Sequence, residues 1–336
     1  MSDRLTFLSC DWGTSSFRLR LIEDEEVLRE SRMSDGCRSI FERLRETGAV
    51  TAETRARAFG GYLNDRLAEW SDLRENRNKP IPLVISGMAS STIGWQEIPY
   101  AAVPLRLDGS NLRASLLDWE KPFWVNESYL IGGVATSDEI MRGEEIEAIG
   151  LLADEQQAHE ACLLVLPGTH SKHLLIRDRE IVDFCTHMTG ELFEALANHT
   201  VLRATVDLGS LDDFSEARMA AFDLGLRSSV ERGLGRSLFQ TRTRAVLKNC
   251  PKAENSWFLS GVLIGAELQD LLAKRSGLPV LLAGVNHLRR LYARAMRILT
   301  PSGAGIWREL PAERIQNAVA LGHRLFLAQR KAPSNE

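Results

Sequence analysis

The order of hydrophobic and polar residues at the start of the chain predicts a small antiparallel sheet. Residues 5–10 form an apolar run, and residues 17–22 alternate apolar residues with Arg, the pattern of a half-buried strand. A turn rich in Gly, Thr and Ser at 11–16 separates these segments, and a charged turn at 23–26 leads into a third strand at 27–31. We therefore expect a three-stranded meander whose first connection is a tight hairpin.

The same pattern returns in the second half of the chain. An apolar run at 162–166 is followed by a Gly-Thr-His-Ser turn at 168–171 and by strand-like segments at 172–177 and 180–185. An offset of 155 residues aligns the two meanders without a gap. The matches are Gly13 with Gly168, Thr14 with Thr169, Ser16 with Ser171, Leu19 with Leu174, Glu25 with Glu180 and Val27 with Val182. Because the order of strands and turns agrees independently of these identities, we interpret the chain as a duplicated domain.

Apolar residues at helical spacing continue each half of the duplication. They predict helices at 53–76, 144–152, 191–198 and 260–273. Buried strands are expected at 81–86 and 279–283, each closed by a glycine.

The domain organisation follows from a break in this pattern. The segment Asp154–Glu160 is polar and lacks periodicity, so we place the boundary between two domains at 1–153 and 154–310. The first domain carries a loop insertion at 87–130. A C-terminal helix at 311–330, with Pro311 at its start, is expected to pack back towards the first domain.

Composition and charge exclude several classes of function. The chain has 336 residues, 44% of them hydrophobic and 26% charged, and its net charge of −4 comes from interspersed residues without a basic patch. Five scattered cysteines form no Cys-x-x-Cys pair, and no apolar stretch suits a secretion signal or a membrane span. We expect a cytoplasmic protein with reduced thiols that binds neither nucleic acid nor membrane. A homodimer remains open.

The two hairpins suit phosphate binding. Backbone N–H groups and hydroxyls at a Gly-Thr-Ser turn can surround phosphate oxygens. One such turn is common in proteins, whereas two at the same place in duplicated halves indicate a shared nucleotide. Asp11, at the end of the first strand, can hold Mg²⁺ directly or through water. The alternative is that Asp11 only accepts a hydrogen bond from the turn.

Several short motifs, in their order and spacing, give the chain a family resemblance. They are Asp11–Ser15, Ser86–Met88, Gly94-Trp95, Met141–Glu145, Pro167–Lys172, Met188–Leu192 and Phe258–Glu267. In these motifs the chain resembles the 2-dehydro-3-deoxygalactonokinase family, within the superfamily of actin, sugar kinases and heat-shock chaperone ATPases. The resemblance implies an α/β fold of two ribonuclease H-like domains with an ATP cleft between them. It also implies Mg²⁺- and ATP-dependent phosphorylation of 2-dehydro-3-deoxy-D-galactonate at its C6 hydroxyl, in galactonate catabolism.

The resemblance also implies which residues bind the nucleotide. They are Gly13, Thr14, Ser15, Ser16, Gly168, Thr169, His170, Ser171, Lys172, Ala283 and Gly284. Lys172 would neutralise phosphate charge, or it is an ordinary lysine on an edge strand. His170 and His173 are not expected to bind metal, because we find no further ligands at compatible spacing.

The catalytic base and the substrate pocket are predicted near the helix at 144–152. Glu144 or Glu145 is the base, since a helix N-terminus keeps a carboxylate ionised, but a purely structural role for one of them is the alternative. Arg142 is expected to bind the substrate carboxylate. The further substrate candidates are Ser90, Ser91, Trp95 and Thr189. For Trp95 the alternative is a packing role. His187, near Thr189, could also line the cleft, and its alternative is a buried structural role.

Two other classes of function fit the paired hairpins. A nucleotide-hydrolysing activator or actin-like scaffold needs no sugar-acid pocket, and neither does a polyphosphate phosphatase of the same fold. Residue chemistry alone does not separate the galactonate-derived acceptor from its gluconate-derived epimer. Only the family resemblance favours galactonate.

Overall fold

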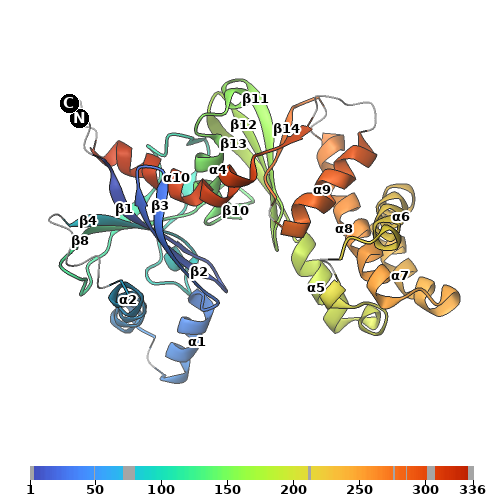
Figure 1. The fold of residues 1–336 in the computed structure, drawn as a ribbon, viewed down its shortest axis with the longest axis horizontal. Coiled ribbons are helices and arrows are strands. Elements are labelled where there is room, and N and C mark those ends of the chain that lie inside the picture. The colour runs from blue at the N-terminus through green and yellow to red at the C-terminus, as the bar shows by residue number, and fades with distance from the viewer. Residues whose placement is uncertain are drawn as a thin grey trace. The chain divides into compact units, whose positions relative to one another are not determined.

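The computed structural model describes most of the chain, which divides into two compact units (Figure 1). The described residues are 4–48, 50–70, 80–210, 213–274, 277–284, 286–300 and 307–331. The first unit comprises residues 1–156, 179–182 and 316–336, and the second comprises 157–178 and 183–315.

The first unit is built on a mixed sheet with the strand order β3-β2-β1-β4-β8-β7. The strands are β1 (Thr6–Trp12), β2 (Phe17–Glu23), β3 (Glu26–Met33), β4 (Ile81–Gly87), β7 (Ala114–Leu116) and β8 (Val125–Ile131). The first three strands form the antiparallel meander expected from the sequence, β4 runs parallel to β1, and β8 runs parallel to β4. Apart from the edge strand β7, which runs antiparallel to β8, the order is β3-β2-β1-β4-β8 with only β2 antiparallel to the rest, which is the ribonuclease H-like arrangement.

The sheet of the second unit repeats this arrangement. Its strands are β11 (Ala161–Leu166), β12 (Ser171–Arg177), β13 (Glu180–His187), β14 (Val280–Leu282) and β15 (Trp307–Glu309). They are ordered β13-β12-β11-β14-β15, with β12 antiparallel to β11 and with β14 and β15 parallel to it. The duplication inferred from the 155-residue offset is therefore a duplication of topology, and the predicted fold class is confirmed.

The insertion after β4 contains short elements rather than one long loop. They are a 3₁₀ turn at Met88–Ser90 and the strands β5 (Ala101–Ala102) and β6 (Leu105–Arg106); two more short strands, β9 (Val134–Ala135) and β10 (Ile140–Met141), follow β8 beyond the insertion. Three of them form a small sheet in the order β10-β9-β5. Trp95 anchors this segment, because its ring packs at right angles to Trp12 and Trp119.

The described helices of the first unit include three that the sequence predicted and one that it did not. The predicted ones are α2 (Ala52–Ala68), α4 (Glu144–Leu152) and α10 (Ala312–Lys331), and the additional one is α1 (Cys37–Glu46). A capping box between Thr51 and Thr54 begins α2, and Phe59 and Leu63 of this helix are fully buried with Trp12. The predicted helix at 53–76 is longer than α2, and its last predicted residues fall in 71–79, outside the described residues.

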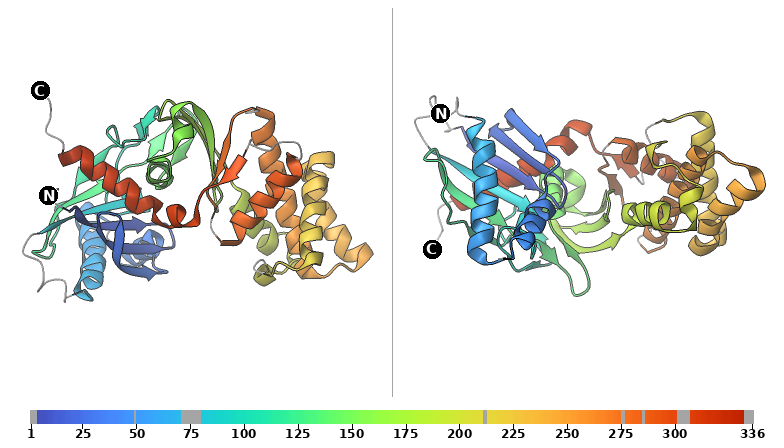
Figure 2. Two further views of the ribbon diagram at one scale, coloured as in Figure 1. Left: turned by 45° about the horizontal axis from the view of Figure 1, so that its top comes forward. Right: turned by 90° about the horizontal axis from the view of Figure 1, so that it is seen from below.

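From Gln316 onwards, α10 belongs to the first unit and crosses both α4 and the meander (Figure 2). A Cβ on Gly150 of α4 would lie 1.8 Å from the Ala318 carbonyl oxygen, so only glycine permits this backbone contact. On the sheet, Ser9 Oγ lies 2.8 Å from His323 Nδ1, and Arg20 donates to the Gln316 carbonyl at 2.7 Å. These contacts fix α10 against β1 and β2.

His323 should make the protein sensitive to acid. Complete burial lowers the pKa of His323 to about 3, against an ordinary value of 6.5. The neutral imidazole therefore stabilises the fold above pH 6.5, and this contribution is lost as the pH falls from 6.5 towards 3. We expect the free energy of unfolding to fall with a slope approaching about 1.4 kcal/mol per pH unit from this group alone.

Urea unfolding at pH 4–7 measures this effect, and His323→Gln should show a shallower fall than the unmodified protein. His199→Gln, at an exposed position near the end of α5, is the matched control and should keep the full slope. If the free energy of unfolding fell with pH at the same slope in His323→Gln and in the unmodified protein, the acid sensitivity would not come from His323.

The second unit adds a layer of helices to its sheet. They are α5 (Thr189–His199), α6 (Glu216–Arg232), α7 (Leu234–Lys248), α8 (Lys252–Lys274) and α9 (Asn286–Leu299), with short 3₁₀ turns at Gln156–His159, Val201–Ala204 and Leu208–Ser210. Figures 1 and 2 show α6 and α8 side by side, where a Cβ on Gly225 would lie 2.0 Å from the Phe258 carbonyl oxygen. None of the helices in the described ranges combines the length and apolar character that a membrane crossing requires.

Candidate active site

The first hairpin is held in place by a helix N-terminus. Within the turn, the Gly13 N–H donates to the Ser16 carbonyl at 2.9 Å. The Gly13 and Thr14 carbonyls accept hydrogen bonds from Cys37 and Arg38, the first residues of α1, at 3.0 and 3.1 Å. The turn is therefore fixed while the side chains of Thr14 to Ser16 keep partial or full exposure.

The second hairpin is held in the same way. The Thr169 carbonyl accepts hydrogen bonds from the N–H groups of Gly190 and Glu191, in the first turn of α5, each at 3.1 Å. A Cβ on Gly190 would lie 2.7 Å from the Thr169 Cα, so this close approach requires glycine. Because α1 and α5 each follow the third strand of their meander, the duplication extends to the contact between hairpin and helix.

Asp11 lies where the first unit brings three segments together. Strands β1 and β4 are parallel, and they pair Asp11 with Ser86 and Trp12 with Gly87 at their carboxyl ends. The third segment is the start of α4, where Gly143 adopts a φ of 111° and a Cβ would lie 3.4 Å from the Gly87 Cα. Open parallel sheets commonly place ligands at this edge.

The two glutamates proposed as the base, both at the N-terminus of α4, differ in burial. Glu145 is fully buried and accepts a hydrogen bond from the Gly143 N–H at 2.7 Å. Its burial and the neighbouring Glu144 raise the pKa of Glu145 to about 8. Glu144 is only partly buried, and its carboxylate accepts a hydrogen bond from the Arg142 N–H at 3.0 Å. Of the two, Glu144 is the one that a substrate can reach.

A third glutamate, Glu147, lies near Asp11 and was not among the residues predicted from the sequence. Burial, Asp11 and Glu144 together raise the pKa of Glu147 to about 8. Burial also raises the pKa of Asp11, although Arg18 and Arg20 oppose the shift. Two carboxylates whose charges disfavour each other form a donor set that a divalent cation would stabilise. The sequence pattern that could have identified Glu147 is its spacing of about one helical turn from Glu144.

The predicted substrate residues Ser90, Ser91, Trp95 and Arg142 contact other residues of the first unit. Arg142 Nη1 donates to the carbonyl and to the hydroxyl of Ser90 at 2.5 and 2.7 Å, and the guanidinium lies 4.3 Å from the Tyr100 ring centre. Ser91 donates to the Met88 carbonyl at 2.7 Å. Trp95 is only 3% exposed, which is the packing role given above as its alternative. Direct substrate contacts for these residues stay a prediction.

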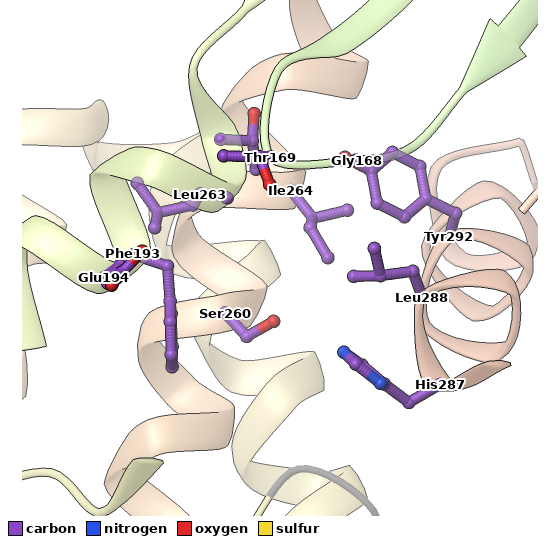
Figure 3. Close-up of a pocket in the computed structure, with 12 residues that line it drawn as sticks. Gly168, Thr169, Phe193, Glu194, Ser260, Leu263, Ile264, His287, Leu288 and Tyr292 are labelled. Carbon is purple, nitrogen blue, oxygen red and sulfur yellow. The ribbon is translucent and has the colours of Figure 1, made fainter. Parts of the chain in front are cut away.

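A pocket in the second unit adjoins its hairpin. The cavity measures about 200 Å³ and lies between the hairpin, α5, α8 and the start of α9. Figure 3 shows the side chains of Ser260 and His287 pointing towards each other across it, with Gly168 and Thr169 at one end. Leu263, Ile264, Leu288 and Phe193 supply apolar walls. A space of this size suits a flat ring system rather than a complete nucleotide.

Glu267 connects the pocket to the hairpin. This residue of α8 is 3% exposed, and its carboxylate accepts hydrogen bonds from Ser171, Thr189 and Tyr292. The same carboxylate lies 2.7 Å from His173 Nε2. Burial raises the pKa of Glu267, but His173 and the two hydroxyls outweigh it and hold the pKa below its usual value. Thr189 and Tyr292 both line the pocket, so one buried carboxylate fixes pocket and hairpin together.

Comparison with known proteins agrees with this arrangement. The sequence model of the 2-keto-3-deoxy-galactonokinase family matches residues 11–306. The chain is 33% identical over 298 residues to a Rhizobium meliloti (strain 1021) protein named "Probable 2-dehydro-3-deoxygalactonokinase DgoK1", covering 86% of this chain and 88% of that protein. It is 30% identical over 269 residues to the 2-dehydro-3-deoxygalactonokinase of Escherichia coli (strain K12), covering 79% and 80% of the two chains.

A crystal structure extends the likeness to the fold. That structure, of a Sinorhizobium meliloti protein assigned to 2-dehydro-3-deoxygalactonokinase, matches with a TM-score of 0.77 and 30% identity, covering 98% of this chain and 100% of that one. The chain belongs to the 2-keto-3-deoxy-galactonokinase family. The expectations of a kinase and of this family are confirmed.

The remaining predicted nucleotide residues of this kinase differ in their surroundings. Lys172 is buried, and its Nζ donates to Thr186 Oγ1 at 2.8 Å, so it is not an exposed edge-strand lysine. His170 is half exposed, and its Nε2 lies 2.5 Å from a carboxylate oxygen of Glu191. Ala283 and Gly284 follow β14, where a Cβ on Gly284 would lie 2.8 Å from the Arg289 Cα at the first turn of α9. Their contacts with nucleotide stay predictions.

Proposed function

We propose that this kinase transfers the γ-phosphoryl group of ATP to the C6 hydroxyl of 2-dehydro-3-deoxygalactonate in the cytoplasm. The supporting observation is a pair of hairpins, Asp11–Ser16 and Gly168–Ser171, each fixed by the first turn of the following helix in a chain of this family. Such turns present N–H groups and hydroxyls to phosphate oxygens. Phosphoryl transfer depends mainly on positioning and on charge stabilisation, which these rigid turns provide.

The nucleotide base is assigned to the pocket of the second unit. Leu263, Ile264 and Leu288 offer apolar surfaces for a purine ring, and Ser260 and His287 offer polar atoms for its edge. Gly168 and Thr169 line the same pocket, so a nucleotide seated there would extend its phosphates along the second hairpin. The geometry of this unit alone supports the assignment.

Asp11 and Glu147 are assigned to Mg²⁺. Both carboxylates are partly buried near each other, and each would ionise more readily beside a cation. When bound, Mg²⁺ supplies positive charge that offsets the charge on the transferring phosphoryl group. Arg18, paired with Asp11 on the neighbouring strand, opposes the rise in the pKa of Asp11 that burial causes.

Glu144 is assigned as the base that accepts the proton of the acceptor hydroxyl. It is partly exposed at the same sheet edge as Asp11, whereas Glu145 is buried and bonded to the backbone. Glu144→Gln should therefore lower kcat by about 10²-fold or more without changing the KM for ATP. Steady-state kinetics at pH 7 measure both constants.

Glu145→Gln is the matched control for this assignment. With a pKa of about 8, Glu145 is a neutral acid at pH 7, so the amide replaces a group of similar charge and shape. We expect kcat within about threefold of the unmodified enzyme. Equal losses for both variants, or a larger loss for Glu145→Gln, would overturn the choice of Glu144.

The acceptor is tested by comparing the two epimers and identifying the product. The galactonate-derived acid should be preferred over the gluconate-derived acid by about tenfold or more in kcat/KM, since a pocket that pairs with one hydroxyl rejects its epimer. Phosphorus–proton NMR of the product should place the phosphate on C6. Preference for the gluconate-derived acid, or phosphate on another carbon, would contradict the proposal.

A further inference from the structure

Two histidines and a cysteine gather between neighbouring strands of the second unit. His173 lies on β12, and Cys185 and His187 lie two residues apart on β13, so their side chains share one face of the sheet. One potential ligand atom from each of the three lies within 4.8 Å of the others. Cys185 Sγ is 3.7 Å from His187 Nε2, and the two imidazole rings are 4.5 Å apart.

His173 is oriented in the way that metal-binding histidines usually are. Its ring is 3% exposed, and Nε2 lies 2.7 Å from the Glu267 carboxylate. Among the described residues, its other nitrogen, Nδ1, is buried without a hydrogen-bond partner. A histidine held through one nitrogen by a carboxylate presents the other nitrogen to a metal ion with a fixed tautomer. A buried nitrogen without a partner would otherwise cost stability.

We propose that His173, Cys185 and His187 bind a divalent transition-metal ion, for which Zn²⁺ is the best match. One sulfur and two imidazole nitrogens suit Zn²⁺, and the tetrahedral geometry leaves one position for water. Magnesium is excluded from this site by ligand type, because it prefers oxygen ligands. The site is therefore separate from the Asp11 and Glu147 pair.

The ionisation of the cluster is compatible with this chemistry. His173 and His187 lower the pKa of the Cys185 thiol to about 6, so the thiolate ligand is already present at neutral pH. Although burial opposes it, Cys185 and Glu267 raise the pKa of His173 to about 9. Zn²⁺ binding needs a thiolate and free imidazole lone pairs, so any proton on these ligand atoms passes to solvent, and no oxidant or reductant is needed.

The metal site would be coupled to the nucleotide site through Glu267. The carboxylate that orients His173 also accepts hydrogen bonds from Ser171 of the hairpin and from Thr189 of the pocket. Zn²⁺ on His173 would place a divalent charge beside the imidazole that contacts Glu267, and so change the electrostatic environment of the carboxylate to which Ser171 and Thr189 donate. We expect Zn²⁺ to change the KM for ATP more than kcat.

The test is a titration of the purified, chelator-treated protein with Zn²⁺ against a chromophoric zinc indicator, with a phosphine reductant to keep thiols free. One equivalent should bind with submicromolar affinity, with release of protons into weak buffer. Co²⁺ in place of Zn²⁺ should give a thiolate-to-cobalt charge-transfer band. Cys185→Ser should abolish that band and weaken binding at least about tenfold.

Two further variants keep the test decisive. Cys250→Ser, at another half-buried free thiol of the second unit, should bind Zn²⁺ like the unmodified protein. His187→Gln should weaken binding as Cys185→Ser does, and thermal unfolding without metal verifies that each variant is folded. The proposal would be overturned if the unmodified protein bound no stoichiometric Zn²⁺, or if folded Cys185→Ser and His187→Gln bound Zn²⁺ as tightly as the unmodified protein.

Discussion

Asp11→Asn should lower kcat by about three powers of ten or more. Asp11 stands at the carboxyl end of β1, where a neutral amide can still accept a hydrogen bond but no longer supplies negative charge to a cation. The substitution should lower kcat rather than raise the KM for ATP, because the nucleotide base is assigned to the second unit. A coupled assay of ADP formation at saturating ATP and acceptor measures it, and higher Mg²⁺ should restore part of the rate.

Asp65→Asn is the matched control, at an exposed position of α2 in the same unit. It should retain unmodified kinetics, which would show that loss of a carboxylate alone does not disturb the unit. Near-normal turnover of Asp11→Asn would remove the cation assignment. The remaining role of Asp11 would then be that of a turn acceptor, although its hairpin closes through Gly13 and Ser16 instead.

Glu267→Gln should impair both nucleotide binding and stability. Four side chains converge on this buried carboxylate, from Ser171, His173, Thr189 and Tyr292. An amide has one acceptor oxygen, and its NH₂ group would face donors that it cannot satisfy. We expect the KM for ATP to rise by about tenfold or more and the free energy of unfolding to fall by roughly 3–5 kcal/mol.

Kinetics and urea unfolding of the same preparation measure these two effects. Glu254→Gln, in the first turn of the same helix, should leave both quantities near their unmodified values. A stable Glu267→Gln with an unchanged KM for ATP would show that the carboxylate does not organise the pocket.

Local patterns in the sequence were sufficient for the fold class and the duplicated meanders, but β8 (Val125–Ile131), a strand of the first sheet, was expected to be part of a loop insertion. Period-2 alternation and the repeated turn predicted both meanders, and apolar spacing predicted α4 at Glu144–Leu152. These features depend on residues close together in the chain. The strand order of the second sheet then follows the first, because both halves share one topology.

Buried polar networks were not predicted, because they depend on contacts between distant segments. His173 meets Glu267 across 94 positions, and the thiol and imidazole of Cys185 and His187 reach His173 only through strand pairing. From the sequence, a metal site was judged only by the spacing of ligands around His170 and His173. In the structure, His170 is half exposed beside Glu191, whereas His173 is buried beside Glu267.

The predicted substrate residues have contacts that the sequence did not indicate. Arg142 and Ser90 bond to each other and Trp95 is buried beside Trp12, while their contacts with substrate stay a prediction. A sequence motif identifies residues that matter without showing which atoms they contact. The structure distinguishes Glu144 from Glu145 as the candidate base, because Glu144 is partly exposed and Glu145 is buried. It also adds Glu147 to the candidate metal ligands, because Glu147 lies near Asp11.

If this chain is a kinase acting on 2-dehydro-3-deoxygalactonate, its formation of ADP should depend on that acceptor. The rate should be measured at saturating Mg²⁺ and ATP, with and without the acceptor. We expect ADP to form only with the acceptor, at one ADP for each acid phosphorylated. An equal rate of ADP or phosphate release without the acceptor, as a scaffold or phosphatase would give, would contradict it.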